Sequence, residues 1–65
     1  MNIEIHTPDG HVFHRTDIGP VRIRDYADIL QEQLPYPILA ARVNHHSRRL
    51  NAWINEDCLL GLLDL

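Results

Sequence analysis

The second half of this chain reads as three short strands joined by polar turns, and this pattern leaves few folds open to it. An apolar run over residues 37–44 stops at an asparagine and is followed by a polar block at residues 45–49. A short return segment at residues 50–51 and an acidic turn at residues 56–57 come next, before a final apolar run over residues 57–65. Because short runs bounded by polar turns are typical of strands, we predict two antiparallel strands followed by a buried last strand.

The first half begins with a strand that is expected to be half-buried. Residues 2–7 alternate polar and apolar side chains, which places Ile3 and Ile5 on one face. Residues 8–10, with the sequence Pro-Asp-Gly, combine a fixed φ with a residue that is free to adopt a positive φ. They therefore predict a hairpin turn after this strand.

The return strand of this hairpin is expected over residues 11–16. Its phase is set by Val12 and Phe13, which are adjacent and cannot both face the core of the protein. We predict that Phe13 points inward, opposite Ile5, and that Val12 is covered at an edge.

A single helix is predicted between the two halves. Gly19 and Pro20 break the chain, and apolar residues then recur at intervals of three, four and seven. The apolar face consists of Ile23, Tyr26, Ala27, Leu30 and Leu34. Its outer side carries Asp25, Asp28 and Glu32, which we interpret as a solvated face. The prolines at residues 35–37 end the helix, since neither can continue it.

Together these elements predict an α+β domain of order ββαβββ, with one helix packed across one face of a mixed sheet of four to five strands. The whole of residues 1–65 forms this single domain, because a chain of this length builds only one hydrophobic core. The expected core residues are Ile3, Ile5, Phe13, Tyr26, Leu30, Leu39, Ala41, Val43, Leu50 and Leu62.

The charge balance argues against broad binding to nucleic acid. Nine acidic residues outnumber six basic residues, for a formal net charge of −3, and all six basic residues are arginines. A protein that binds duplex nucleic acid through its phosphates is expected to be positively charged. No long apolar run or basic leader suggests a membrane span or a signal peptide. With one cysteine, Cys58, an internal disulfide is impossible, and we expect a cytoplasmic protein.

The sequence predicts neither catalysis nor a cofactor or metal. Five histidines are present, but their spacing matches no zinc signature, and we expect them at exposed strand and turn positions. Ser47 follows His46 directly, so on a strand the two side chains point to opposite faces and cannot form a nucleophile and base pair. A Walker A motif is missing as well, which excludes kinase chemistry by these residues.

The polar block is the leading candidate for a recognition surface. Arginine presents a planar fork that suits phosphate or carboxylate groups, and a turn would expose it. The candidate residues are Arg42, His45, His46, Arg48 and Arg49. The alternative is a solvated hairpin turn whose charges serve solubility. Arg22 and Arg24, near the start of the helix, form a second candidate.

The sequence of the second half resembles the TGS family of small, ubiquitin-like β-grasp domains. The resemblance rests on residues 38–44, on the Leu50-Asn51 pair and on the ending from Asp57 to Leu65. It is strongest to the TGS domain that precedes the catalytic domain of bacterial uridine kinase-like enzymes of the phosphoribulokinase/uridine kinase type. Where TGS domains carry a Gly-Thr-Thr or Gly-Ser-Thr cap, this chain has Gly-Pro-Val-Arg at residues 19–22.

This resemblance implies a non-catalytic accessory or regulatory domain at the N-terminus of a longer uridine kinase-like protein. Such a domain would bind a small ligand or pack on the kinase domain of the same chain. Two alternatives remain open: an RNA- or ribosome-contacting TGS module of a translation-related enzyme or GTPase, and a free-standing ubiquitin-like interaction protein. The ubiquitin-like sulfur carriers are excluded for residues 1–65, because the chain closes on Asp64-Leu65 and not on Gly-Gly.

Overall fold

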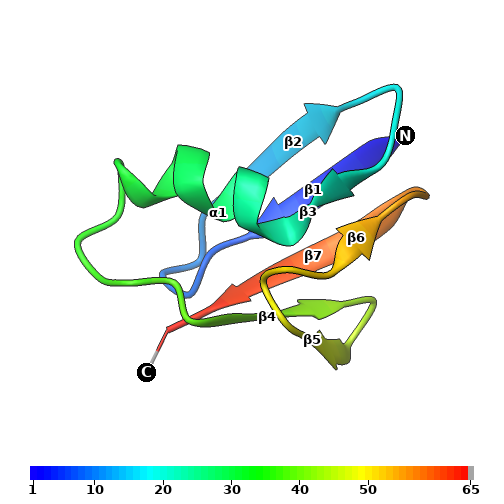
Figure 1. The fold of residues 1–65 in the computed structure, drawn as a ribbon. Helices are drawn as coiled ribbons and strands as arrows, with labels where there is room; N and C mark the ends of the chain where they lie inside the picture. The colour runs from blue at the N-terminus through cyan, green and yellow to red at the C-terminus, as the bar shows by residue number, and fades with distance from the viewer. Residues whose placement is uncertain (65) are drawn as a thin grey trace.

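One helix lies across one face of a mixed five-stranded sheet in the computed structural model, which describes residues 1–64 (Figure 1). The first part of the chain forms β1 (Asn2–His6), β2 (Val12–Thr16), β3 (Val21–Arg22) and α1 (Ile23–Gln31). The second part forms β4 (Ala40–Val43), β5 (His46–Arg48), β6 (Trp53–Ile54) and β7 (Cys58–Leu63). The predicted α+β class is therefore confirmed. Leu65, the end of the predicted last apolar run, lies outside the described residues.

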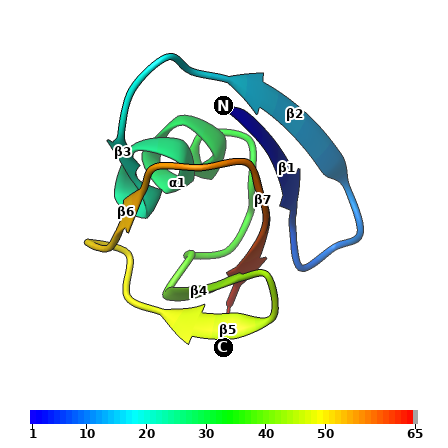
Figure 2. The same ribbon diagram turned by 90° about the vertical axis from the view of Figure 1, so that its right-hand side faces the viewer.

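The first and last strands meet at the centre of the sheet. Its strand order is β2-β1-β7-β4-β5, in which β1 and β7 are parallel and the other neighbours are antiparallel. A second sheet, which the sequence did not predict, consists of only β3 and β6. Figure 2 shows the large sheet curving around α1, with β3 and β6 at its open side. The buried last strand is confirmed, and β7 is apolar on both faces apart from Gly61.

The β1–β2 hairpin has the predicted register, since Ile5 lies opposite Phe13. Gly10 adopts a φ of 91°, which a residue with a Cβ would adopt only under strain. The prediction for Val12 is wrong, because its side chain is 47% exposed. It lies on the side of the sheet away from the helix, on an edge strand that no other strand covers.

The helix buries the predicted face but ends earlier than expected. Ile23, Tyr26, Ala27 and Leu30 are buried against the sheet. The amide of Arg22 donates to the Asp25 carboxylate over 3.2 Å, which satisfies one backbone donor at the start of the helix. After Gln31 the chain continues in turns, so Leu34 packs on the core from outside the helix and is only partly buried.

The polar block at residues 45–49 is mostly strand and not turn, contrary to our prediction. The hairpin between β4 and β5 turns at Asn44 and His45, whose φ values are 49° and 72°. Positive φ at both positions is the signature of a tight two-residue turn, which leaves His46–Arg48 free to pair with β4. The return strand predicted at residues 50–51 is instead a turn closed by the Ala52 amide and the Arg49 carbonyl, 2.9 Å apart.

The core lies between α1 and the large sheet. Six of the predicted core residues are buried there, namely Ile3, Ile5, Tyr26, Leu30, Ala41 and Leu62. Phe13, Val43 and Leu50 are only partly buried at its border. Leu39 was wrongly placed in the core, since it is 49% exposed.

Ile38 takes the place that was predicted for Leu39. Its amide donates to the Gln31 side chain over 2.8 Å, and this bond fixes the chain so that the Ile38 side chain points inward. Ile54 and Leu60 are also buried, although neither was predicted in the core. No helix among residues 1–64 is long and apolar enough to cross a membrane.

Candidate functional site

The structure does not bring the five predicted recognition residues together. Arg42 lies opposite Ser47 and Gly61, on the side of the sheet that faces away from the helix. Arg48 lies opposite Ala41, which is fully buried beneath the helix, so Arg48 belongs to the other side. His46 shares that side with Arg48, because alternate residues of a strand point the same way.

His45 occupies the hairpin turn at a φ of 72°. This conformation is uncommon for a residue other than glycine, although asparagine and histidine adopt it more often than most. The conformation of the turn is therefore sufficient to explain a histidine at position 45. Arg49 follows β5 at the start of the next turn.

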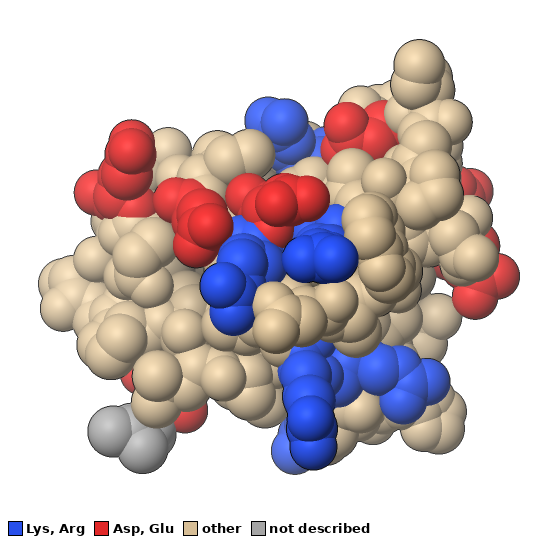
Figure 3. Space-filling view, in the orientation of Figure 1, with Lys and Arg blue, Asp and Glu red and all other residues tan. Residues whose placement is uncertain are grey.

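Backbone hydrogen bonds next to the second sheet hold the start of the helix, with Arg22 and Arg24, close to the end of the polar block. The amide of Ile23 donates to the Ala52 carbonyl over 3.0 Å, and the amide of Arg24 donates to the Leu50 carbonyl over 2.7 Å. These bonds hold the start of the helix along the segment that follows β5. Arg24 therefore lies next to the turn that begins at Arg49. Figure 3 shows arginine side chains in the middle and lower part of the molecule, with acidic side chains directly above the middle group.

The only tryptophan of the chain, Trp53, completes this surface. Val21 and Ile54 pair with each other, and Ile54 is buried, so their neighbours in the two strands point outward. The outward residues are Pro20, Arg22, Trp53 and Asn55. We call these four residues, together with Arg24, the arginine–tryptophan face.

Trp53 is exposed on this face and carries a stacked arginine. Its side chain is 61% exposed, and the Arg22 Cζ atom lies 4.8 Å from the centre of its ring. A shallow hollow of about 550 Å³ beside the ring is lined by Pro20, Trp53 and Asn55. A guanidinium group over an indole ring gains from the negative charge of the ring face. The pair therefore presents a flat apolar surface next to a positive charge.

None of the arginines among residues 1–64 is paired with a carboxylate. The ion pairs in this part of the chain join His6 to Glu4 over 2.6 Å and His11 to Asp9 over 3.0 Å. The guanidinium groups of Arg22 and Arg24 thus keep donors for an external anion. Asp25 is the nearest acidic residue in sequence, and its charged carboxylate accepts from the backbone amide of Arg22 over 3.2 Å.

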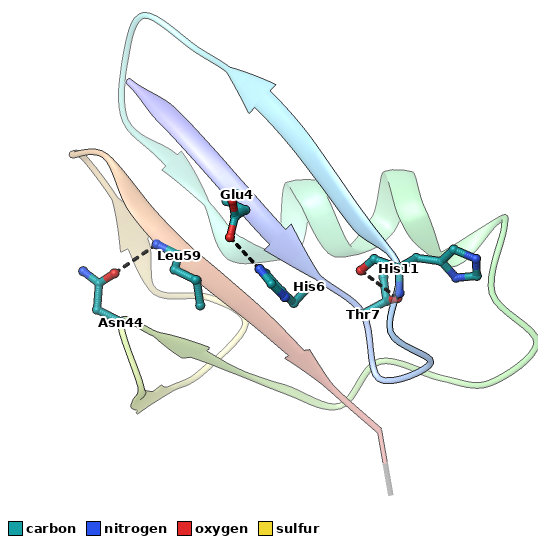
Figure 4. A network of polar contacts seen from close by, with 6 residues as sticks. All are labelled: Glu4, His6, Thr7, His11, Asn44 and Leu59. Carbon is teal, nitrogen blue, oxygen red and sulfur yellow. Dashed lines mark hydrogen bonds and ion pairs between the residues drawn. The ribbon is translucent and has the colours of Figure 1, made fainter.

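A second hollow of about 610 Å³ lies over β1, β2 and the start of β7, and several of its polar groups form hydrogen bonds that link neighbouring segments. The Glu4 carboxylate accepts from His6, which holds the pKa of Glu4 below its usual value (Figure 4). The Leu59 amide donates to the Asn44 side chain over 2.9 Å, and the Asn2 amide donates to Asp57 over 2.6 Å. These bonds hold strands in register, so we interpret this hollow as structural.

The remaining reactive side chains do not assemble into a reaction centre within residues 1–64. No three histidine, cysteine or acidic side chains there come together in an arrangement that could hold a metal ion. Burial raises the pKa of the half-buried Cys58 thiol, and the neighbouring Glu56 and Asp57 raise it further. A thiol with a raised pKa is a poor nucleophile at neutral pH.

The sequence interpretation missed Trp53, Asn55 and Pro20. A lone tryptophan within a polar segment could have drawn attention to Trp53, because such a residue is rarely left exposed without a partner. The pairing of β3 with β6, which brings it to Arg22, has no counterpart in the sequence pattern. No protein-family model matches this chain, and no curated protein is significantly similar to it.

Proposed function

We propose that this chain has the ubiquitin-like β-grasp fold, as its resemblance to TGS domains implies. The parallel pairing of β1 with β7 at the centre of the sheet supports this fold. Each of these two strands is flanked by a hairpin partner, and one helix covers one face of the sheet. The additional short strand β3 overlaps residues 19–22, where the chain departs from the TGS cap sequence, and it pairs with β6.

For its function, we propose a non-catalytic accessory domain at the N-terminus of a uridine kinase-like P-loop enzyme, which binds a ligand or packs on the kinase domain. The observation that carries the binding role is the exposed Trp53 with Arg22 stacked on it. Exposed tryptophan and arginine are the residue types that most often dominate binding energy at interfaces. Removing this ring from water would give a partner a favourable free energy of association.

Two measurements test this proposal. Reading the gene beyond the codon for Leu65 tests the kinase part, since a Gly-x4-Gly-Lys-Ser/Thr motif in the continuing frame is expected. A stop codon or an unrelated domain would contradict it. Titrating the ¹⁵N-labelled chain with the domain encoded downstream tests the binding part. We expect amide shifts at β3 and β6, which a Trp53→Ala variant should lose and an Arg42→Ala variant should keep.

The second candidate function is an RNA-contacting module. The same arginine and tryptophan side chains favour it, because bases stack on aromatic rings and phosphates pair with guanidinium groups. The formal net charge of −3 opposes long-range attraction of a polyanion, which is why we rank this function second.

A further inference from the structure

We infer that the arginine–tryptophan face binds a nucleoside monophosphate, with the base stacked against Trp53 and the phosphate held by Arg22 and Arg24. This inference rests on the proposed function and names the class of ligand that the accessory domain would take. It commits to a small ligand, and a nucleotide within an RNA strand is treated below as a competing source of the same chemistry.

The shape of the hollow favours a flat ring over an aliphatic side chain. It is lined by Pro20, Trp53 and Asn55, so one flat aromatic ring stands among its walls. An aliphatic group gains most when apolar walls enclose it, whereas a base gains its stacking energy from one flat surface. Asn55 adds an amide that can both donate to and accept from the edge of a base.

The charge around the hollow favours a phosphate. Arg22 stacks on the tryptophan, Arg24 lies next to the turn that begins at Arg49, and no carboxylate lies within 4.0 Å of either guanidinium group in the part of the chain described. A phosphate monoester accepts bidentate hydrogen bonds from arginine, and these charge-assisted bonds are roughly twice as strong as neutral ones. The stacked Arg22 is already oriented by the Trp53 ring, so less side-chain entropy is lost when it binds an anion.

The net charge decides between a free nucleotide and a nucleic acid strand. Nine acids against six arginines repel a polyanion at long range, but this repulsion acts weakly on a ligand with one phosphate. Contacts within the hollow are short-range, and the carboxylate nearest to them in sequence, that of Asp25, accepts from the Arg22 amide over 3.2 Å. A monophosphate therefore uses the local arginines without meeting the full repulsion that a strand would meet.

The single tryptophan makes the test direct, because all tryptophan fluorescence of the chain comes from position 53. We expect AMP to quench this fluorescence saturably, with a Kd on the order of 1 mM, as a stacked base and a charged contact together would provide. Adenosine, which lacks the phosphate, should bind more weakly. Ribose 5-phosphate, which lacks the base, should not quench.

Variants on the two sides of the sheet separate a site from a general charge effect. Arg24→Ala should weaken AMP binding roughly tenfold, whereas the matched control Arg42→Ala, on the opposite side, should leave it unchanged. Trp53→Phe keeps a flat ring and should retain most of the amide shifts that AMP causes in NMR spectra, while Trp53→Ala should lose them. Equal effects of Arg24→Ala and Arg42→Ala, or no saturable quenching by AMP, would overturn the inference.

A short single-stranded oligoadenylate forms the last arm of this experiment. If it binds far more tightly than AMP, with an affinity that falls steeply with salt, the ligand is RNA and the monophosphate inference fails. If the downstream domain shifts β3 and β6 but AMP does not, the inference fails while the proposed function stands. If AMP binds as expected but no P-loop follows in the gene, the nucleotide site stands and the kinase part of the proposed function fails.

Discussion

Two leucines show how strongly the contribution of an apolar side chain to stability depends on its burial. Leu30 is 6% exposed, and Leu39, which the sequence also placed in the core, is 49% exposed. We expect Leu30→Ala to lower the free energy of unfolding by about 2–5 kcal/mol, because it removes transfer energy and leaves a cavity. Leu39→Ala should stay within about 0.5 kcal/mol of the wild type. Urea denaturation of both variants measures this difference, and equal losses would contradict the burial of Leu30.

Asp9 is a single residue whose titration should make stability depend on pH. The Thr7 hydroxyl donates to its carboxylate and His11 lies 3.0 Å away, and these contacts lower the pKa of Asp9 from 3.8 to about 2. A carboxyl whose pKa is lower in the folded state stabilises the fold above its unfolded pKa. That stabilisation is lost as the pH falls from 3.8 towards about 2.

The Asp9→Asn variant tests this dependence. Its urea midpoint should fall less than that of the wild type between pH 4 and pH 2, since it has no carboxyl to protonate in this window. Thr7→Ala removes the largest cause of the shift and should raise the pKa of Asp9 in a carbonyl-carbon NMR titration. An unchanged titration in Thr7→Ala would show that the Thr7 hydroxyl does not lower this pKa.

Among elements, the β4–β5 hairpin gives the clearest prediction. His45 holds a φ of 72°, which costs a residue with a Cβ about 1–2 kcal/mol relative to glycine. His45→Gly should therefore stabilise the protein by about 0.5 kcal/mol after the added flexibility of glycine in the unfolded chain is subtracted. The control His46→Gly lies in β5 and should destabilise it. Thermal unfolding compares the two, and a loss of stability in His45→Gly would oppose the turn assignment.

Elements with a periodic pattern could be predicted, and those that depend on tertiary pairing could not. The alternation of Ile3 with Ile5 and the helical spacing up to Leu30 predict β1 and α1, because burial on one face imposes that spacing. β3 and β6 have two residues each, which is too short for any period. β5 is an exposed edge strand, so it needs no apolar side chain. Its polar residues therefore predicted a turn.

The whole molecule adds a site that the local sequence could not reveal. Arg22 and Trp53 are far apart in the chain and meet only because β3 pairs with β6. By contrast, Arg42 and Arg48 are close in sequence, and the alternation of a strand sends them to opposite sides of the sheet. Proximity in the sequence therefore does not place Arg42 and Arg48 on one side of the sheet.

The balance of charge over the whole molecule predicts weak binding to RNA. Because nine acids outnumber six arginines, long-range attraction is unfavourable and only the local arginines can contact phosphates. We expect RNA binding near physiological salt to have a Kd weaker than about 10⁻⁴ M, the weak end of non-specific binding. Titrating labelled RNA at two salt concentrations measures this affinity and its salt dependence.

A comparison of two double variants shows which arginines contribute to RNA binding. Arg48→Ala/Arg49→Ala removes two arginines of the polar block, and Arg22→Ala/Arg24→Ala removes the arginine stacked on Trp53 together with its neighbour at the start of the helix. Both change the net charge equally, so a general electrostatic effect would weaken RNA binding by the same factor in each. If the Trp53 side of the molecule is the binding surface, the second variant should lose more affinity. Micromolar RNA binding that disappears only in Arg48→Ala/Arg49→Ala would instead favour an RNA-contacting TGS module that binds through the polar block at residues 45–49.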